Sequence, residues 1–534
     1  AILKALGKMA DLSVLPFLLE NALDSEPHIQ ELMSAIGRIY HANMPEAFLK
    51  RHQAEMAEIV RRHFPLQLTE KVSALWKDSK VAERRGMLHI AGFLTDMTLI
   101  DYVLDELENP YLQRDALQAA AAFGTPAVPH LVRRLNAAVS VEQRLFLIQL
   151  LAATGSPEGV VPLLSQVRGD DDQVKMEGLA GLGRIEDDRS LQELTAVLKE
   201  PDPAFHEVAI HAVHTLLKQR PEFRDRVRKQ GEAMLTSPED RTRRNGYALL
   251  AESIAYGADG NLLKGLKDPS PDVRRFVVGL AGARIGPDAK DQLLPMLSDD
   301  NPKVRRAVIT TLGRYLLGSG PDILLTTLQD EDLWVRSEAA FYLAQSTDPA
   351  TADALLTLLE EDELPVRISA LKGLAEVGCG ALFGRVLELA RNDPNMEIRR
   401  VCLGALARSG RSEGQALLMK ALEDRHWEIR SAAIELMGDS ADRRFLPVLL
   451  KELERDPDVL VKQSVIQALS RLGAVEAVPR LLQYLTDKDL KEAAYQFFLG
   501  LGRRYVPLIE HEAQSVDFQT KLILIEIMKS LELA

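Results

Sequence analysis

The stretch HEVAIHAVH, residues 206–214, holds the densest group of potential metal ligands in this sequence. On a helix, Glu207, His211 and His214 lie at positions i, i+4 and i+7 and share one face. A carboxylate and two imidazoles can hold a metal ion and leave one coordination position open. The alternative is a set of packed or solvated histidines. We adopt that alternative, because isolated matches of this kind often arise by chance, and we predict no metal and no cofactor.

Other catalytic motifs are missing from the sequence. It contains no GxxxxGK[ST] phosphate-binding loop, no GxSxG nucleophile elbow and no HExxH helix. The two cysteines, Cys379 and Cys402, lie in no CxxC or Cys/His cluster. This predicts neither a disulfide framework nor a structural zinc, and it favours a reducing compartment. We therefore expect a protein that is not an enzyme.

Length and composition indicate how such a chain is built. At 534 residues it exceeds the size of a single hydrophobic core, so several domains or a repeat array are expected. Hydrophobic residues make up 46% and aromatic residues only 5%, which favours helices packed through Ala and Leu. A net charge of −13 disfavours nucleic-acid binding. No run of about 18 apolar residues predicts a membrane span, so we expect a cytoplasmic protein, with membrane association arising only through regions outside this sequence.

A basic residue recurs at intervals of 31 or 32 residues along the second half of the chain. These residues are Arg274, Arg305, Arg336, Arg367, Arg399, Arg430 and Lys462. An acid stands six positions before each, namely Asp268, Asp299, Asp330, Glu361, Asp393, Asp424 and Asp456. We expect the acids to satisfy free N–H groups where helices begin, and the bases to form a ladder with the acid of their own or the neighbouring repeat. Exposed ion pairs contribute only about 0–1 kcal/mol each, so the ladder is predicted to set register more than stability.

Each repeat predicts two antiparallel helices. In VRRFVVGLAGARIG, Val273, Val277 and Ala281 form an apolar stripe at helical spacing, and a shorter amphipathic segment, NLLKGLKD, precedes it. Neither helix can bury its stripe alone, so the pairs must stack. The sequence therefore predicts an all-α solenoid of roughly sixteen helix pairs, regular over residues 268–534 and more irregular over residues 1–267.

Two stretches interrupt the repeat. Residues 43–65 add about one helix and residues 219–237 lengthen one unit. We interpret both as tolerated loop insertions, with a bend or a contact surface as the alternative. The first residues predict the tail of a helix, and the chain ends in a helix with no polar cap after it. Because solenoids need polar capping repeats, we expect this chain to be a fragment of a longer protein.

These units resemble the HEAT repeat family, in particular its short bacterial type that is also found in phycobilisome lyase-like proteins. The resemblance rests on the Asp-x5-Arg/Lys spacing, the Val-Arg or Ile-Arg pair and the Ala/Leu/Gly-rich helix that follows, and it is specific from Asp268 to about Gly473. It implies an α-solenoid whose Val-Arg-bearing helices line the concave side. We predict a non-enzymatic scaffold or adaptor that binds a protein or peptide partner on that side.

Two other functions stay open. One is a lyase-like or chaperone-like factor for a chromophore protein, and the other is a regulatory array attached to a membrane or signalling domain outside this sequence.

The sequence matches enzymatic HEAT-like families less well. Deoxyhypusine hydroxylase, a HEAT-like metalloenzyme, draws its iron ligands from His-Glu pairs in several repeats, whereas only His206–Glu207 stands in the matching place here. HEAT-like DNA glycosylases need a basic concave face, and only three of seven concave positions are Arg.

Three groups of side chains are predicted to bind a partner. The first consists of the concave arginines, and the second lies in the basic stretch Lys218–Arg244, where nine basic residues face five acidic ones and an acidic segment or anionic lipid surface would fit. The third consists of two aromatic residues in turns that enter inner helices. The residues are Arg275, Arg306 and Arg400; Arg224, Arg228, Arg243 and Arg244; and Trp334 and Trp427.

Overall fold

The computed structural model describes residues 26–41, 58–64, 66–254, 260–319, 321–346, 348, 350–361, 363–377 and 379–533. Over these ranges the regular secondary structure is helical and no strand occurs. Of the insertion predicted at 43–65, only residues 58–64 lie within the described part, and residues 1–25 also lie outside it. The chain divides into two compact units, Ala1–Leu280 and Ala281–Ala534.

The α-helices of the N-terminal unit are named in chain order. They are α3 (Glu26–His41), α5 (Leu66–Leu75), α6 (Val81–Leu94), α7 (Ile100–Asp105), α8 (Gln113–Ala122), α9 (Val128–Ala137), α10 (Val141–Ala153), α11 (Val160–Val167), α12 (Asp172–Leu182), α13 (Asp188–Val197), α14 (His206–Gln219), α15 (Arg224–Met234), α16 (Asp240–Ser253), α17 (Gly260–Leu263) and α18 (Pro271–Arg284), whose end passes into the second unit.

The C-terminal unit continues the same alternation. Its α-helices are α19 (Lys290–Leu293), α20 (Pro302–Ser319), α21 (Pro321–Thr327), α22 (Leu333–Leu343), α23 (Ala350–Glu361), α24 (Leu364–Val377), α25 (Phe383–Asn392), α26 (Met396–Arg408), α27 (Ser412–Ala421), α28 (Trp427–Asp439), α29 (Leu446–Arg455), α30 (Val459–Arg471), α31 (Val478–Leu481), α32 (Lys491–Leu501), α33 (Val506–Glu512) and α34 (Phe518–Leu533).

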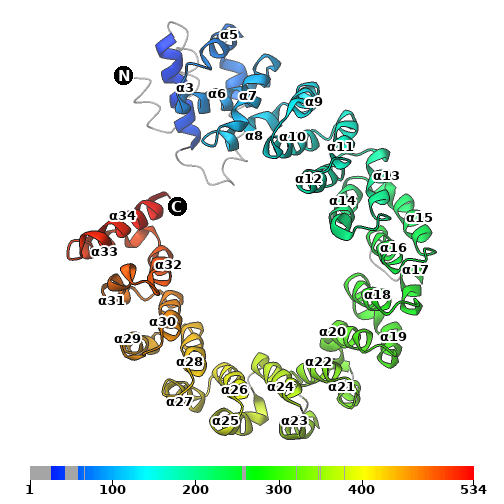
Figure 1. The fold of residues 1–534 in the computed structure, drawn as a ribbon, viewed down its shortest axis with the longest axis vertical. Helices are drawn as coiled ribbons and strands as arrows, with labels where there is room; N and C mark the ends of the chain where they lie inside the picture. The colour runs from blue at the N-terminus through cyan, green and yellow to red at the C-terminus, as the bar shows by residue number, and fades with distance from the viewer. Residues whose placement is uncertain are drawn as a thin grey trace. The chain divides into compact units, whose positions relative to one another are not determined.

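Within each unit, the helices from α7 onward form two rows (Figure 1). Most odd-numbered helices pack against the even-numbered helix that follows them, as α25 does on α26. Successive even-numbered helices also pack side by side, as α22 does with α24 and α28 with α30. A short turn joins the two helices of a pair, so they run antiparallel. The predicted all-α solenoid of helix pairs is confirmed.

The start of α26 shows how sequence produces one of these pairs. Asp393 accepts a hydrogen bond from the Asn395 N–H at 2.8 Å, and Asn395 in turn caps the helix by accepting from Glu397 N–H at 2.9 Å. The helix then buries Ile398 and Cys402 completely. Capping satisfies donors that have no partner in the first turn, while the buried stripe supplies the apolar area that holds one pair on the next.

The 31-residue interval continues through the N-terminal unit, although different residue types occupy the position. Arg243 stands 31 residues before Arg274, and the residue at the same position of the preceding repeat is His206, 37 residues before Arg243. Three further steps of 31 residues reach the residues at this position in the earlier repeats, which are Lys175, Arg144 and Gln113. The six extra residues before Arg243 fall in the stretch 219–237, which forms the end of α14, a 3-10 turn at Pro221–Phe223 and α15.

Candidate functional site

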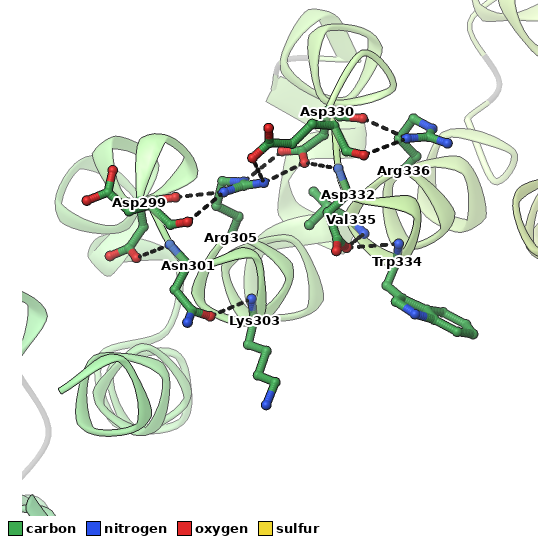
Figure 2. A network of polar contacts seen from close by, with 11 residues as sticks. Asp299, Asn301, Lys303, Arg305, Asp330, Asp332, Trp334, Val335 and Arg336 are labelled. Atoms are coloured by element: carbon green, nitrogen blue, oxygen red, sulfur yellow. Dashed lines mark hydrogen bonds and ion pairs between the residues drawn. The ribbon is translucent and has the colours of Figure 1, made fainter.

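Arg305 joins its own turn to the next helix pair. Its Nε and Nη2 donate to the two carboxylate oxygens of Asp330 at 2.8 and 2.7 Å. Its Nη1 donates to the carbonyl oxygen of Asp299, six residues earlier, at 2.9 Å (Figure 2). Asp330 also accepts from the N–H of Asp332 at 2.8 Å. The base therefore pairs with the acid of the following repeat and with the backbone of its own repeat.

The same arrangement recurs along the chain, and we call it the ladder. Its acid and base lie 25 or 26 residues apart in the pairs Arg243–Asp268 (2.8 Å), Arg367–Asp393 (2.6 Å), Arg399–Asp424 (3.5 Å) and Arg430–Asp456 (2.6 Å). Of the two possibilities that the sequence left open, the neighbouring repeat supplies the carboxylate. The prediction that these are exposed pairs is wrong, because Arg305 and Asp456 side chains retain only 7% and 3% of their exposure.

Carboxylates of the ladder have lowered pKa values. Burial alone would raise the pKa of Asp330, but hydrogen bonds from Arg305 and from the Asp332 N–H outweigh it and hold the pKa below its ordinary range. Asp268 and Asp456 have lowered pKa values for the same reasons, with Arg243 and Arg430 as their donors. These carboxylates are therefore ionised structural groups and not candidates for general acid catalysis.

His206 occupies a ladder position and takes part in packing. Its Nε2 lies 3.1 Å from the carbonyl oxygen of Glu200, six residues earlier, which is the backbone contact that Arg305 makes. Its Nδ1 lies 2.9 Å from Nδ2 of Asn245. Because a carbonyl oxygen only accepts, Nε2 carries the proton and Nδ1 accepts from Asn245. His206 is therefore a buried, hydrogen-bonded histidine at a ladder position, whereas Glu207 next to it is exposed.

The candidate metal ligands do not converge. His214 Nδ1 lies 2.5 Å from Glu252 Oε2, while the ring centroids of His211 and His214 are 6.2 Å apart. Among the described residues, no three or more His, Cys, Asp or Glu side chains are arranged to hold a metal ion. The alternative of a metal site on Glu207, His211 and His214 thus receives no support. Cys379 and Cys402 are free and buried, and burial raises the pKa of Cys379 to about 11.

The basic stretch Lys218–Arg244 is largely neutralised by partners of its own chain. These contacts join Arg220 to Glu186 and Glu222, Arg226 to Asp188, Arg228 to Glu232, and Arg241 to the Pro201 carbonyl. Arg243 is only 8% exposed and pairs with Asp268, so as a partner-binding candidate it is corrected to a ladder residue. Arg224 is exposed, and the exposed Arg244 lies 4.5 Å over the ring of Phe276. Arg224 and Arg244 stay predictions.

Nearby carboxylates also engage the three concave arginines. Arg275 lies 3.8 Å from Asp272, Arg306 lies 3.4 Å from Glu338, and Arg400 lies 2.5 Å from Glu397. Their side chains remain 43–52% exposed. Each can still contact a partner, but a partner would meet paired charges and not a continuous positive surface.

Trp334 and Trp427 belong to a longer set of exposed or half-buried apolar residues. The first residue of five successive even-numbered helices in the C-terminal unit is apolar, and the second residue of α22 and α30 is apolar too. We call this set the apolar row: Leu333, Trp334, Leu364, Met396, Trp427, Val459 and Leu460. Trp334 is 55% exposed, Leu460 46% and Trp427 37%. Figure 2 shows Trp334 pointing away from the ladder network.

Helix formation does not explain the apolar row. The residue that packs inward is the third of each helix, such as Val335 and Ile429, which are at most 2% exposed. In α18 and α20 the first residue is Pro, which suits that position. The row begins only after them. Sequence analysis found its two Trp members and missed the others, although apolar residues three places before each ladder base were a visible signal.

None of the described helices combines the length and apolarity that crossing a bilayer requires. A comparison with curated protein sequences gives no match. Solved structures with similarity to the chain include yeast importin-β, Kap95p (14% identity over 99% of this chain and 84% of that one, TM-score 0.40), and YibA of Escherichia coli (16% over 68% and 97%, TM-score 0.24). Another is the karyopherin Kap121p bound to the extreme C-terminus of the phosphatase Cdc14p (12% over 99% and 75%, TM-score 0.43). Identities this low say nothing of what this chain binds.

Family models match the repeats directly. Residues 261–323 and 385–452 match the model of HEAT repeats, and residues 335–361 match that of the PBS lyase HEAT-like repeat. The matched segments contain the ladder residues Arg305, Arg336, Arg399 and Arg430, together with Trp427. These segments of the chain are therefore HEAT repeats.

Proposed function

We propose that this chain is a non-enzymatic scaffold that binds a protein partner along its even-numbered helices. The observation that carries the proposal is the apolar row. Trp334, Leu364, Trp427, Val459 and Leu460 are each between 37% and 55% exposed and stand at the first or second position of their helices. Single exposed apolar residues are ordinary, whereas an aligned set indicates an interaction surface.

The spacing of the apolar row indicates the form of the partner. Packed helices lie about 8–10 Å apart, so successive members of the row are separated by about that distance. A peptide in the polyproline II conformation has three residues per turn and advances about 3.1 Å per residue, so every third side chain lies on the same side at about this interval. The partner that fits is an extended segment with apolar residues at every third position.

The neighbouring side chains add specificity to this surface. Arg306 lies 5.8 Å over the ring of Trp334 and also contacts Glu338. The arrangement holds the indole on one side and leaves its other face to the solvent. Aromatic residues with a polar neighbour are common anchors of protein interfaces.

The experiment is a pull-down from the source cell lysate with three forms of the full chain, read by mass spectrometry. The row variant carries Leu364→Gln, Trp427→Gln and Val459→Gln. The matched control carries Val377→Gln and Met419→Gln, two exposed apolar residues (51% and 41%) that lie outside the row.

We expect one protein partner to be retained by the wild type and the control and lost by the row variant. Retention of that partner by all three forms would place the binding surface elsewhere. A pigment or metal retained without any protein partner would contradict the scaffold function.

A further inference from the structure

A cavity of about 390 Å³ lies between the helix pairs α7/α8 and α9/α10 of the N-terminal unit. About half of its wall is apolar, with Leu104, Leu107 and Leu147 at 5–6% exposure and Phe146 half-buried. Pockets of a few hundred Å³ with apolar walls and a few polar groups are typical binding sites. Nothing in the ladder or the apolar row accounts for this one.

At this cavity the Arg–Asp pair of the ladder is missing. Gln113 stands at the ladder position of α8, and Ala138 lies 25 residues later, where the acid of the next repeat belongs. Both residues line the cavity. Gln113 keeps the backbone contact of a ladder base, since its Nε2 donates to the carbonyl of Leu107, six residues earlier, at 3.1 Å. What the site lacks is the bulk and charge of the Arg–Asp pair.

The equivalent place in the C-terminal unit is charged. A hollow between α25/α26 and α27/α28 is lined by Asp393, Arg399 and Asp424, two of which form the ladder pair at 3.5 Å. There the ladder position contributes a guanidinium and a carboxylate to the lining. At the N-terminal cavity the corresponding residues, Gln113 and Ala138, are uncharged.

The rim of the cavity is acidic. Glu108 and Glu142 are both exposed at its mouth. Arg134, which also lines the cavity, forms ion pairs with Asp105 at 2.7 Å and with Asp101 at 3.5 Å. Gln143 donates to Glu108, and Gln113 approaches Glu142 at 3.5 Å, but neither neutralises a charge. A ligand with a positive charge next to its apolar part complements this rim.

Two exposed apolar residues stand beside the mouth. Tyr111 is 75% exposed and follows Pro110 of the lining, and Val139 is 91% exposed between Ala138 and Ser140 of the lining. They extend the apolar area beyond what a small molecule inside the cavity would cover. The occupant is therefore a chain segment that also lies across the rim.

We propose that this cavity receives one large apolar side chain of a protein partner, and that a neighbouring Lys or Arg of the same segment pairs with Glu108 and Glu142. The apolar row belongs to the other unit. The proposal for this cavity and the proposed function of the apolar row can therefore be disproved independently of one another.

The test uses the full chain as bait for a displayed library of random peptides about a dozen residues long. The wild type is compared with Gln113→Arg/Ala138→Asp, which rebuilds the ladder pair and fills the cavity. The best peptide is then synthesised with a fluorescent label and its affinity is measured by anisotropy. A second variant, Glu108→Gln/Glu142→Gln, keeps the cavity and removes the rim charge.

We expect enriched peptides to carry a Leu, Phe or Trp beside Lys or Arg. The labelled peptide should bind the rebuilt variant at least about tenfold more weakly, which corresponds to about 1.4 kcal/mol. The rim variant should bind it more weakly too, with less dependence on salt. The rebuilt variant must keep the melting temperature of the wild type or exceed it. Equal binding to wild type and rebuilt variant, acidic peptides, or no peptide that depends on the cavity would overturn the proposal.

Discussion

Arg305 and Asp330 lie 25 residues apart and form a two-point ion pair, with N–O distances of 2.8 and 2.7 Å, that joins one helix pair to the next. The third guanidinium nitrogen of Arg305 is bound to the turn of its own repeat. Because both connections use one rigid planar group, they specify how each repeat sits on its neighbour.

Removing the acid of this pair should destabilise the C-terminal unit. Asp330→Ala leaves the buried Arg305 without its carboxylate, and loss of one partner of a buried pair costs about 3–5 kcal/mol. We expect faster amide hydrogen exchange in α20 and α22 and a lower urea midpoint. Arg306→Ala, an exposed control, should change stability by no more than about 0.5 kcal/mol. An unchanged midpoint for Asp330→Ala would show that the pair contributes no stability.

The ladder should make stability fall in acid. The pKa values of Asp268, Asp330 and Asp456 are lowered in the folded chain from an ordinary value of 3.8. Their contribution is therefore complete above that value and is lost as pH falls through the folded pKa. Melting temperatures measured from about pH 6 to about pH 3 should fall less steeply for Asp330→Ala than for the wild type. Asp272→Ala, at an exposed carboxylate, should keep the wild-type slope; equal slopes in all three would contradict a role for the ladder.

Arg243 should behave as a structural residue. It is 8% exposed and pairs with Asp268 at 2.8 Å, so Arg243→Ala should lower the melting temperature of the N-terminal unit and speed hydrogen exchange in α16. The exposed Arg224 provides the comparison, and Arg224→Ala should leave both measurements unchanged. Similar effects of the two substitutions would mean that the Arg243–Asp268 ion pair does not stabilise the fold.

The apolar row should contribute little to folding. Trp427→Gln and Leu364→Gln replace side chains that are 37% and 39% exposed, and each should change the free energy of unfolding by no more than about 0.5 kcal/mol. Val335→Gln, at a fully buried position two residues into α22, should instead unfold its repeat. A large loss in the free energy of unfolding for Trp427→Gln would mean that the apolar row contributes to packing and stability.

Much of the fold could be predicted from local pattern. The stripe of Val273, Val277 and Ala281 and the recurring acid before each helix are short-range features, and they predict helices, turns and the repeat interval. The same interval at Lys175 and His206 was less visible, because Lys and His replace Arg there and six extra residues intervene before Arg243. The structure shows the continuity through one shared contact, the bond from the side chain to the carbonyl six residues earlier.

The site was harder to predict, because exposure is a property of the packed array. Arg243 and Arg244 are adjacent in sequence, yet one is buried against Asp268 and the other lies over Phe276 at the surface. The 31-residue interval to Arg274 does distinguish Arg243 from Arg244 in the sequence, but their burial depends on which side of α16 faces α14.

The sequence by itself determined the helix pairs, the interval between them and the family to which the repeats belong, because these depend on contacts within about one repeat. Only the tertiary structure decided that a ladder base such as Arg305 pairs with the acid of the following repeat. The carboxylate of Asp330 is taken up by Arg305 and by the Asp332 N–H, while Arg336, the base six residues after it, donates to the Asp330 carbonyl and to Glu363. Stacking likewise decided that Gln113 and Ala138, which stand 25 residues apart, line one cavity.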